Sequence, residues 1–309
     1  MARILILGPG VQGTLYGVRL SLAGHNVTFV ARGQRAEELR SRGAIIEHAL
    51  TGMRQIAQLP IVERIQPSTH AEVCLVAVRR EQLEGILPDL AAAPGILRVV
   101  LMVNHACGSE FLFSSLGRQR VVLAFPGAAG TITESVDRYV EVAEQPTAVE
   151  ASAPDIAALL KGSGFRVSLV NDMDSWLRRH AVFVCAIAGA LYETGVDVKR
   201  LSTDNEKMRD LIVAVREGWA AMDRAGVGPP PMALRAIFQW VPLPFSVLYW
   251  RRLIGSPQGE YYFARHTRHA PREMAALADD VLAVIPAEPI PHLRRLYGAI
   301  ESAAAAQYR

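Results

Sequence analysis

Three residues able to do chemistry stand together at Arg178, Arg179 and His180, before an apolar run that carries no charge until Glu193. A guanidinium offers a permanent positive charge and a fork of donors, which suits a carboxylate or a developing oxyanion. Histidine is the side chain that gains and loses a proton near neutral pH. Because successive helix residues point about 100° apart, at most two of the three can face one site. We expect at least one arginine to line a cleft, with His180 either a neighbouring proton donor or a packed core residue.

A glycine-rich loop, GPGVQG, follows the apolar run 3–7 and opens a helical pattern. In such a loop the first glycine permits a tight turn, the second lets the backbone approach a pyrophosphate, and the third allows close packing of helix on strand. The start of the helix favours phosphate charge. The pattern at this place predicts dinucleotide binding. The residues expected to contact the cofactor here are Gly8, Gly10, Val11, Gln12 and Gly13.

The end of the second predicted strand indicates which dinucleotide binds. NAD-binding loops carry a carboxylate there, which accepts a hydrogen bond from the ribose 2′-hydroxyl. This chain reads FVARGQR, with Arg32 at that place and Arg35 close behind. A guanidinium cannot accept that hydrogen bond but pairs well with a 2′-phosphate. The sequence therefore predicts NADP(H) rather than NAD(H), unless Arg32 is merely a solvated loop charge.

Strand and helix patterns alternate along the first half of the chain. Nearly continuous apolar strands of this kind are typical of a parallel, doubly wound sheet. From residue 172 onward the patterns are almost all helical and alanine-rich. We predict a Rossmann-type α/β domain over 1–171 and an all-helical domain over 172–309. The strands are expected at 3–7, 26–31, 44–48, 59–63, 71–78, 97–103 and 120–125, and the long helices at 174–194, 204–225 and 271–284.

Composition excludes several classes of protein. The formal net charge is +3 and the basic residues form no run, which argues against a nucleic-acid partner. The three cysteines Cys74, Cys107 and Cys185 form no CxxC pair, as expected of a cytoplasmic protein. The apolar segment 238–250 is interrupted by prolines and is too short to span a membrane, so we expect a buried segment, a lid or a homodimer contact.

These motifs resemble the ketopantoate reductase (2-dehydropantoate 2-reductase) family. The likeness is close over 8–43 and 71–90, recognisable over 101–112, and looser in the helical half. It implies a Rossmann domain followed by a helical domain and NADPH-dependent reduction of a 2-keto acid between them. By this resemblance Arg79 stands where the family has a lysine near the cofactor phosphates. Asn104 matches the family's asparagine that touches both cofactor and substrate, and Glu273 matches its substrate-binding glutamate.

The chain departs from the family pattern at the catalytic helix. The family has a lysine there, with asparagines four and eight residues later. This chain has no lysine between Lys161 and Lys199, and the lysine position falls on Arg178 or Arg179. The two asparagine positions become Phe183 and Ile187 in one alignment, or Val182 and Ala186 in the other. Likewise Tyr261 stands in place of a family serine, and His105 and Cys107 replace the glycines that follow the family's asparagine.

Three functions are consistent with these residues. The first is NADPH-dependent reduction of a small 2-keto acid or related carbonyl, with ketopantoate the first candidate. The second is reduction of an imine or a bulkier ketone, since the lysine and both helix asparagines are lost. The third is a non-catalytic NADP(H)-binding sensor or scaffold. A metal site at His266, His269 and Glu273 is not expected, because a helix starting at Pro271 would leave the histidines in a turn before it.

Overall fold

The computed structural model describes residues 1–285 and 288–307, and its contacts divide the chain into two compact units. The first unit contains residues 1–103 and 109–173. The second contains the short segment 104–108 together with the chain from Asp174 to the C-terminus. The helical unit therefore includes a piece of chain that lies between two strands of the α/β unit in sequence.

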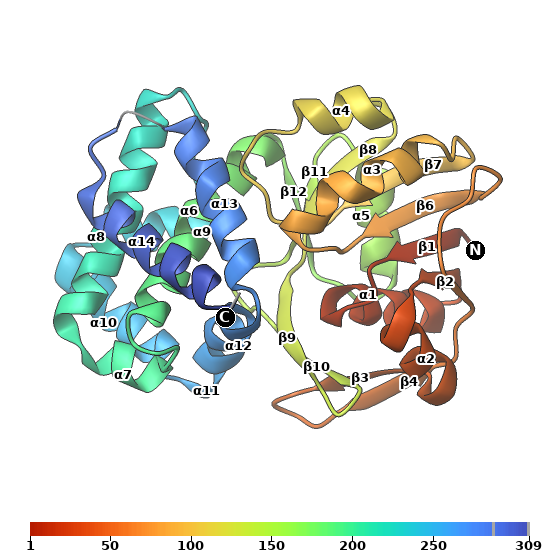
Figure 1. The fold of residues 1–309 in the computed structure, drawn as a ribbon, viewed down its shortest axis with the longest axis horizontal. Helices are drawn as coiled ribbons and strands as arrows, with labels where there is room; N and C mark the ends of the chain where they lie inside the picture. The colour runs from red at the N-terminus through yellow and green to blue at the C-terminus, as the bar shows by residue number, and fades with distance from the viewer. Residues whose placement is uncertain (286–287, 308–309) are drawn as a thin grey trace. The chain divides into compact units, whose positions relative to one another are not determined.

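The first unit is built on a sheet of eight strands in the order β12-β11-β8-β7-β6-β1-β2-β5 (Figure 1). Neighbouring strands run parallel except β8 and β11, which are antiparallel. The predicted Rossmann-type fold is therefore confirmed, with one antiparallel pair near an edge. The strands are β1 (Arg3–Leu7), β2 (Asn26–Val30), β5 (Ile61–Val62), β6 (Ala71–Val76), β7 (Ile96–Leu101), β8 (Val121–Phe125), β11 (Thr147–Glu150) and β12 (Val167–Val170).

Helices cover the main sheet on both faces, as a doubly wound fold requires. Figure 1 shows α3 and α4 on one side of the sheet and α1 on the other. Apolar residues of α1 such as Leu15 and Val18 are fully buried in the core of this unit. The helical segments are α1 (Val11–Leu22), α2 (Gly33–Arg42), the 3₁₀ turn η1 (Arg80–Gln82), α3 (Leu83–Ala91), α4 (Glu110–Leu116) and α5 (Pro154–Gly162).

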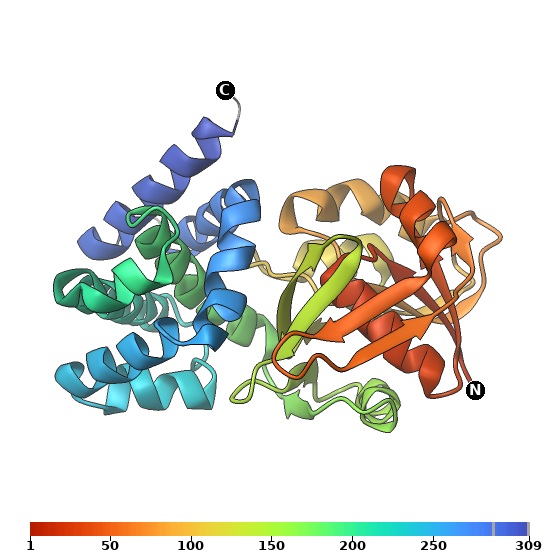
Figure 2. The ribbon, with the colours of Figure 1, turned by 90° about the horizontal axis from the view of Figure 1, so that it is seen from below.

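A second, four-stranded sheet in the order β4-β3-β10-β9 covers the outer side of α1 (Figure 2). Its strands are β3 (Ala44–His48), β4 (Arg54–Ala57), β9 (Ala128–Thr133) and β10 (Val136–Glu141). The strand at 44–48 is predicted from the sequence, but the sheet that it joins is not. The reason lies in β10, where charged Asp137 and Arg138 interrupt the apolar pattern, although Asp137 is fully buried.

The second unit is a bundle of helices around α6 (Met173–Tyr192). The run from Ala181 to Leu191 is buried except for Val184, which confirms the predicted central helix. A Cβ on Gly189 would lie 2.4 Å from the carbonyl oxygen of Leu296, so glycine is what lets α14 approach α6 closely. The surrounding helices are α7 (Val198–Thr203), α8 (Asn205–Arg224), α9 (Met232–Arg235), α10 (Leu243–Ile254), α11 (Pro257–Gly259), α12 (Arg265–His269), α13 (Pro271–Val284) and α14 (Pro291–Ala306).

Two short π-helical segments, η2 (Ala236–Trp240) and η3 (Glu260–Ala264), interrupt the bundle. Each places one phenylalanine, Phe238 or Phe263, against the ring of Phe183 on α6. The apolar segment 238–250 is broken between η2 and α10, with Phe238 and Trp250 buried and Phe245 exposed. Within 1–285 and 288–307, no helix has the length and apolar character needed to span a membrane.

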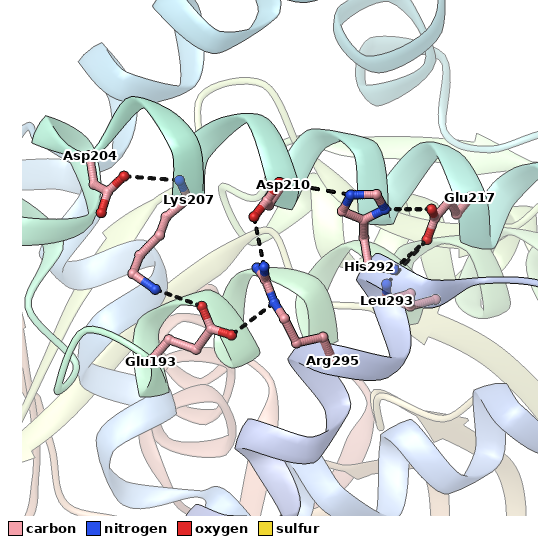
Figure 3. Close-up of polar contacts among 8 residues, drawn as sticks. All are labelled: Glu193, Asp204, Lys207, Asp210, Glu217, His292, Leu293 and Arg295. Atoms are coloured by element: carbon pink, nitrogen blue, oxygen red, sulfur yellow. Dashed lines mark hydrogen bonds and ion pairs between the residues drawn. The ribbon is translucent and has the colours of Figure 1, made fainter.

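Polar contacts join α6, α8 and α14 on the outer side of the bundle (Figure 3). Glu217 on α8 accepts hydrogen bonds from the backbone amides of His292 at 2.9 Å and Leu293 at 3.2 Å. Its other carboxylate oxygen lies 2.6 Å from His292 Nδ1. The residue before α14, Ile290, has no side chain able to cap the helix. Glu217 therefore supplies from another helix the N-terminal cap that α14 lacks.

Candidate functional site

The glycine loop lies at the carboxyl end of β1, between β6 on one side and β2 on the other. This is the point where the strand order reverses, and open α/β sheets bind ligands there. Gly8 has φ +86°, and a Cβ there would lie 2.8 Å from Val78. A Cβ on Gly13 would lie 2.4 Å from the carbonyl oxygen of Gly8. A Cβ on Gly10 would meet nothing within 4 Å, so the loop is open where a ligand would approach its backbone.

Arg35 holds the glycine loop from the side of α2. Its Nε donates to the carbonyl oxygen of Pro9 at 2.8 Å, and its Nη2 donates to Thr14 Oγ1 at 2.8 Å. The same nitrogen lies 2.6 Å from Asp137 Oδ2 on β10. Burial raises the pKa of Asp137 to about 6, and the charge of Arg35 opposes that rise. The Arg35 side chain therefore binds other residues of the protein, and its position in the sequence does not predict these contacts.

Arg32 differs from Arg35 because its side chain makes no such contacts in the described structure. It stands just after β2 and is the residue that precedes α2. It is exposed, and within the described chain it has no hydrogen-bond or ion-pair partner. Arg79, just after β6, is also exposed. Two exposed arginines thus follow the strands on either side of β1, and their charge suits the phosphates of a dinucleotide.

Gln12 presents a polar atom beside the same loop. Its Nε2 donates to the carbonyl oxygen of Ala128 on β9 at 2.5 Å. Its Oε1 is buried and has no hydrogen-bond partner in the described structure. Buried acceptors in proteins are normally satisfied, so an orphaned oxygen beside an open loop fits a ligand that donates to it. These features fit the predicted dinucleotide.

The two arginines of α6 have different surroundings. Arg179 is fully buried and donates to the carbonyl oxygens of Trp219, Val227 (2.7 Å) and Gly228 (2.8 Å). Its Nη2 also lies 2.5 Å from Asp223 Oδ1. Arg178 keeps 27% of its side chain exposed and pairs with Asp174 at 2.9 Å. Arg178 is thus the arginine of this pair that solvent can reach.

His180 is buried and stacks on Trp176, with ring centroids 4.8 Å apart. Burial lowers the pKa of its imidazole to about 3. At neutral pH the ring is therefore uncharged and holds no acidic proton to donate. Its surroundings match the packed core residue that the sequence analysis offers as one of two roles for His180.

Asn104 begins the segment 104–108, which belongs to the helical unit. Its Oδ1 is buried and has no hydrogen-bond partner among the residues described. Gly108 ends the segment at φ +88°, and a Cβ there would lie 2.6 Å from Arg178 Nη2. The structure therefore brings the Asn104 segment and Arg178 together within one unit.

Glu273 lies in the first turn of α13 and is buried, with Oε2 3.3 Å from His266 Nε2. The predicted helix start at Pro271 is confirmed. The expectation that the two histidines lie in a turn is wrong, because His266 and His269 belong to the short helix α12. Across 1–285 and 288–307 no group of three His, Cys, Asp or Glu residues is placed to hold a metal ion.

Fold and loop together define a Rossmann-type nucleotide-binding domain joined to a helical domain. Residues 4–135 match the family described as ketopantoate reductase PanE/ApbA. A 2-dehydropantoate 2-reductase of Archaeoglobus fulgidus is 28% identical over 190 residues. That match covers 60% of this chain and 62% of the relative, which is less than two thirds of its length. The resemblance to the ketopantoate reductases that the motifs predict is thus confirmed in sequence over these residues.

Solved structures show the same fold over nearly the whole chain. A PanE/ApbA family ketopantoate reductase from Ralstonia eutropha JMP134 has a TM-score of 0.77 at 18% identity, covering 99% of this chain and all of the other (100%). A 2-dehydropantoate 2-reductase from Methylococcus capsulatus has a TM-score of 0.72 at 18% identity, covering 99% and 98%. D-mandelate dehydrogenase with NADH and anilino(oxo)acetate has a TM-score of 0.74 at 15% identity, covering 97% of each chain.

Proposed function

We propose that this protein is an NADPH-dependent reductase of a small 2-keto acid or related carbonyl, with 2-dehydropantoate the first substrate to test. The observation that carries the proposal is the open glycine loop at the strand-order reversal, followed by an exposed Arg32 that has no partner within the described chain. The family match over residues 4–135 supports it. Gly8 to Gly13 and Arg79 would hold the pyrophosphate, and Arg32 the 2′-phosphate.

Hydride transfer to a carbonyl builds negative charge on its oxygen. The nicotinamide supplies the hydride when it is bound. We assign stabilisation of the oxygen, or binding of the substrate carboxylate, to Arg178, and a structural role to Arg179. Arginine keeps its proton at all ordinary pH values, and His180 is neutral, so the proton would come from water. Asn104 would orient nicotinamide and substrate, and Glu273 would hold the far end of the substrate.

A bulkier or aromatic ketone is the second candidate substrate. The side chain of Phe183, one turn beyond Arg179, lies among Phe238, Trp250 and Phe263 with ring centroids 5.2–6.2 Å apart. No polar side chain stands on α6 between Ala181 and Leu191 except Cys185, whose thiol is fully buried. The helix therefore offers little to bind a hydroxylated substrate, which favours an apolar one.

The first experiment is NADPH oxidation with 2-dehydropantoate and with phenyl-substituted 2-keto acids, with NADH in parallel. Turnover with NADPH is the expected result. Arg32→Gln should weaken NADPH binding about 10- to 100-fold and leave NADH binding unchanged, because one charge-assisted contact is lost. Arg42→Gln, at the other end of α2 and also exposed, is the matched control. Tight NADPH binding without turnover on any carbonyl or imine would contradict the proposal and favour a sensor.

A further inference from the structure

The segment 104–108 belongs to the helical unit although the residues on both sides of it belong to the α/β unit. It follows β7 directly, yet Ala106 is fully buried in the apolar core formed by α6, α8, α13 and α14. A short loop packed into another core has polar backbone groups that need partners. How its backbone is held therefore decides where Asn104 lies.

Asp280 on α13 supplies one of those partners. Its Oδ2 accepts a hydrogen bond from the backbone N–H of Ala106 at 3.2 Å, and both residues are buried. A buried carboxylate that accepts from a backbone amide makes a stronger contact than a neutral acceptor. Asp280 stands seven residues after Glu273, which puts the two carboxylates on one face of the helix.

Arg178 holds the other end of the same segment. Its guanidinium lies over Gly108, where a Cβ would come within 2.6 Å of Nη2, and Asp174 fixes that guanidinium at 2.9 Å. The segment is therefore held at Ala106 by α13 and bordered at Gly108 by α6. Asn104, with its unpartnered buried Oδ1, lies two residues before the contact made by Asp280.

We propose that Asp280 is a positioning residue. It fixes the Asn104 segment to α13 and so holds Asn104 in a constant position relative to Glu273 and Arg178. The proposal rests on the proposed function for its catalytic consequence, although not for the contact itself. In this role Asp280 acts through the backbone of Ala106. It follows that the substrate-binding groups form one preassembled set within the helical unit.

Hydrogen–deuterium exchange on the full-length protein tests the contact without requiring turnover. Asp280→Leu removes the acceptor, and the exchange rate of the Ala106 amide should rise about 10- to 100-fold. Asp280→Asn keeps an acceptor oxygen and should give a clearly smaller rise. Asp279→Leu is the matched control, since Asp279 is exposed on the same helix and should leave the segment unchanged. Asp280→Ser, too short to reach Ala106, replaces the leucine variant if that variant does not fold.

Kinetics then test the positioning role. Asp280→Leu should lower kcat about tenfold or more and raise KM for the carbonyl, while the Kd for NADPH, which depends on the glycine loop, changes less than about threefold. Asp280→Asn should restore most of kcat. Unchanged exchange at Ala106 overturns the proposal, and so does faster exchange with unchanged kinetics. If wild-type protein turns over no carbonyl, the proposed function and the positioning role fail, whereas the exchange result still decides whether Asp280 holds the segment.

Discussion

Separate replacement of Arg179 and Arg178 by methionine should show that Arg179 stabilises the fold and that Arg178 acts in the reaction. Methionine has a similar length and keeps the apolar stem of the side chain. In Arg179→Met, the carbonyl oxygens of Val227 and Gly228 lose their donor. Both residues follow α8, so no helical hydrogen bond takes its place. Asp223 is 57% exposed at its side chain and can be rehydrated at little cost.

The magnitude follows from these contacts. A buried acceptor left unsatisfied costs about 1–3 kcal/mol, so two of them lower the free energy of unfolding by about 2–6 kcal/mol. The Arg178–Asp174 pair is a partly exposed i,i+4 ion pair on α6. Such pairs contribute about 0.3–0.5 kcal/mol, so Arg178→Met should leave stability nearly unchanged. The proposed function predicts that the same substitution lowers kcat/KM at least about 100-fold, because a charge on the reacting oxygen loses its partner.

Urea unfolding followed by tryptophan fluorescence is the suitable assay. All four tryptophans, Trp176, Trp219, Trp240 and Trp250, belong to the helical unit, so their emission reports on that unit alone. Equal unfolding midpoints for the two variants would refute the reasoning, because Arg179 would then contribute no more than a surface charge. Lost turnover in Arg179→Met at a temperature where it is fully folded would move the functional role back to Arg179.

Three further predictions concern other parts of the structure. Burial in the folded protein lowers the pKa of His180 to about 3, so below pH 6.5 the unfolded chain binds a proton that the folded chain does not. The free energy of unfolding, measured with urea, should therefore fall by up to about 1.4 kcal/mol per pH unit between pH 6.5 and 4 because of this histidine. In His180→Phe the fall should be less steep. Gly13→Ala places a Cβ 2.4 Å from the Gly8 carbonyl oxygen and should lower both thermal stability and NADPH affinity, whereas Gly10→Ala meets no protein atom and should weaken only NADPH binding in a titration. Glu217→Ala removes the cap of α14 and should destabilise the helical unit by about 1–2 kcal/mol, measured by the same fluorescence unfolding, with Glu301→Ala as an exposed control on α14.

The main sheet could be predicted because its strands are continuous apolar runs bounded by glycine or charge. The loop from Gly8 to Gly13 could be predicted because Gly8 and Gly13 stand where a side chain would collide with neighbouring atoms. The second sheet could not, since β10 carries Asp137 inward, and the charge of Arg35, about 100 residues away, helps to make that burial tolerable. Contacts between such distant residues leave no local pattern in the sequence.

The arginine proposed to act in catalysis could be narrowed from the sequence to Arg178 or Arg179, but the sequence does not show which of the two it is. Arg178 and Arg179 differ by about 100° around α6, and the pattern of α6 alone does not show which direction is covered by α8. The structure shows it through the carbonyl groups at the end of α8 that surround Arg179. The contact between Asp280 and Ala106 could not be predicted for a similar reason, because the partner of Asp280 is a backbone amide, and backbone amides carry no sequence signal.

The insertion of residues 104–108 into the helical core affects the order in which the protein can complete its fold during synthesis. Every strand of the main sheet has been made once residue 170 is reached, so the α/β unit can assemble while the ribosome is still adding helices. Ala106 has no apolar core to enter, and its amide no carboxylate to bind, until about 175 further residues have followed. Asn104 would then reach its place only after the α/β unit has formed, and a nascent chain stalled before α13 would lack the carboxylate that holds the Asn104 segment.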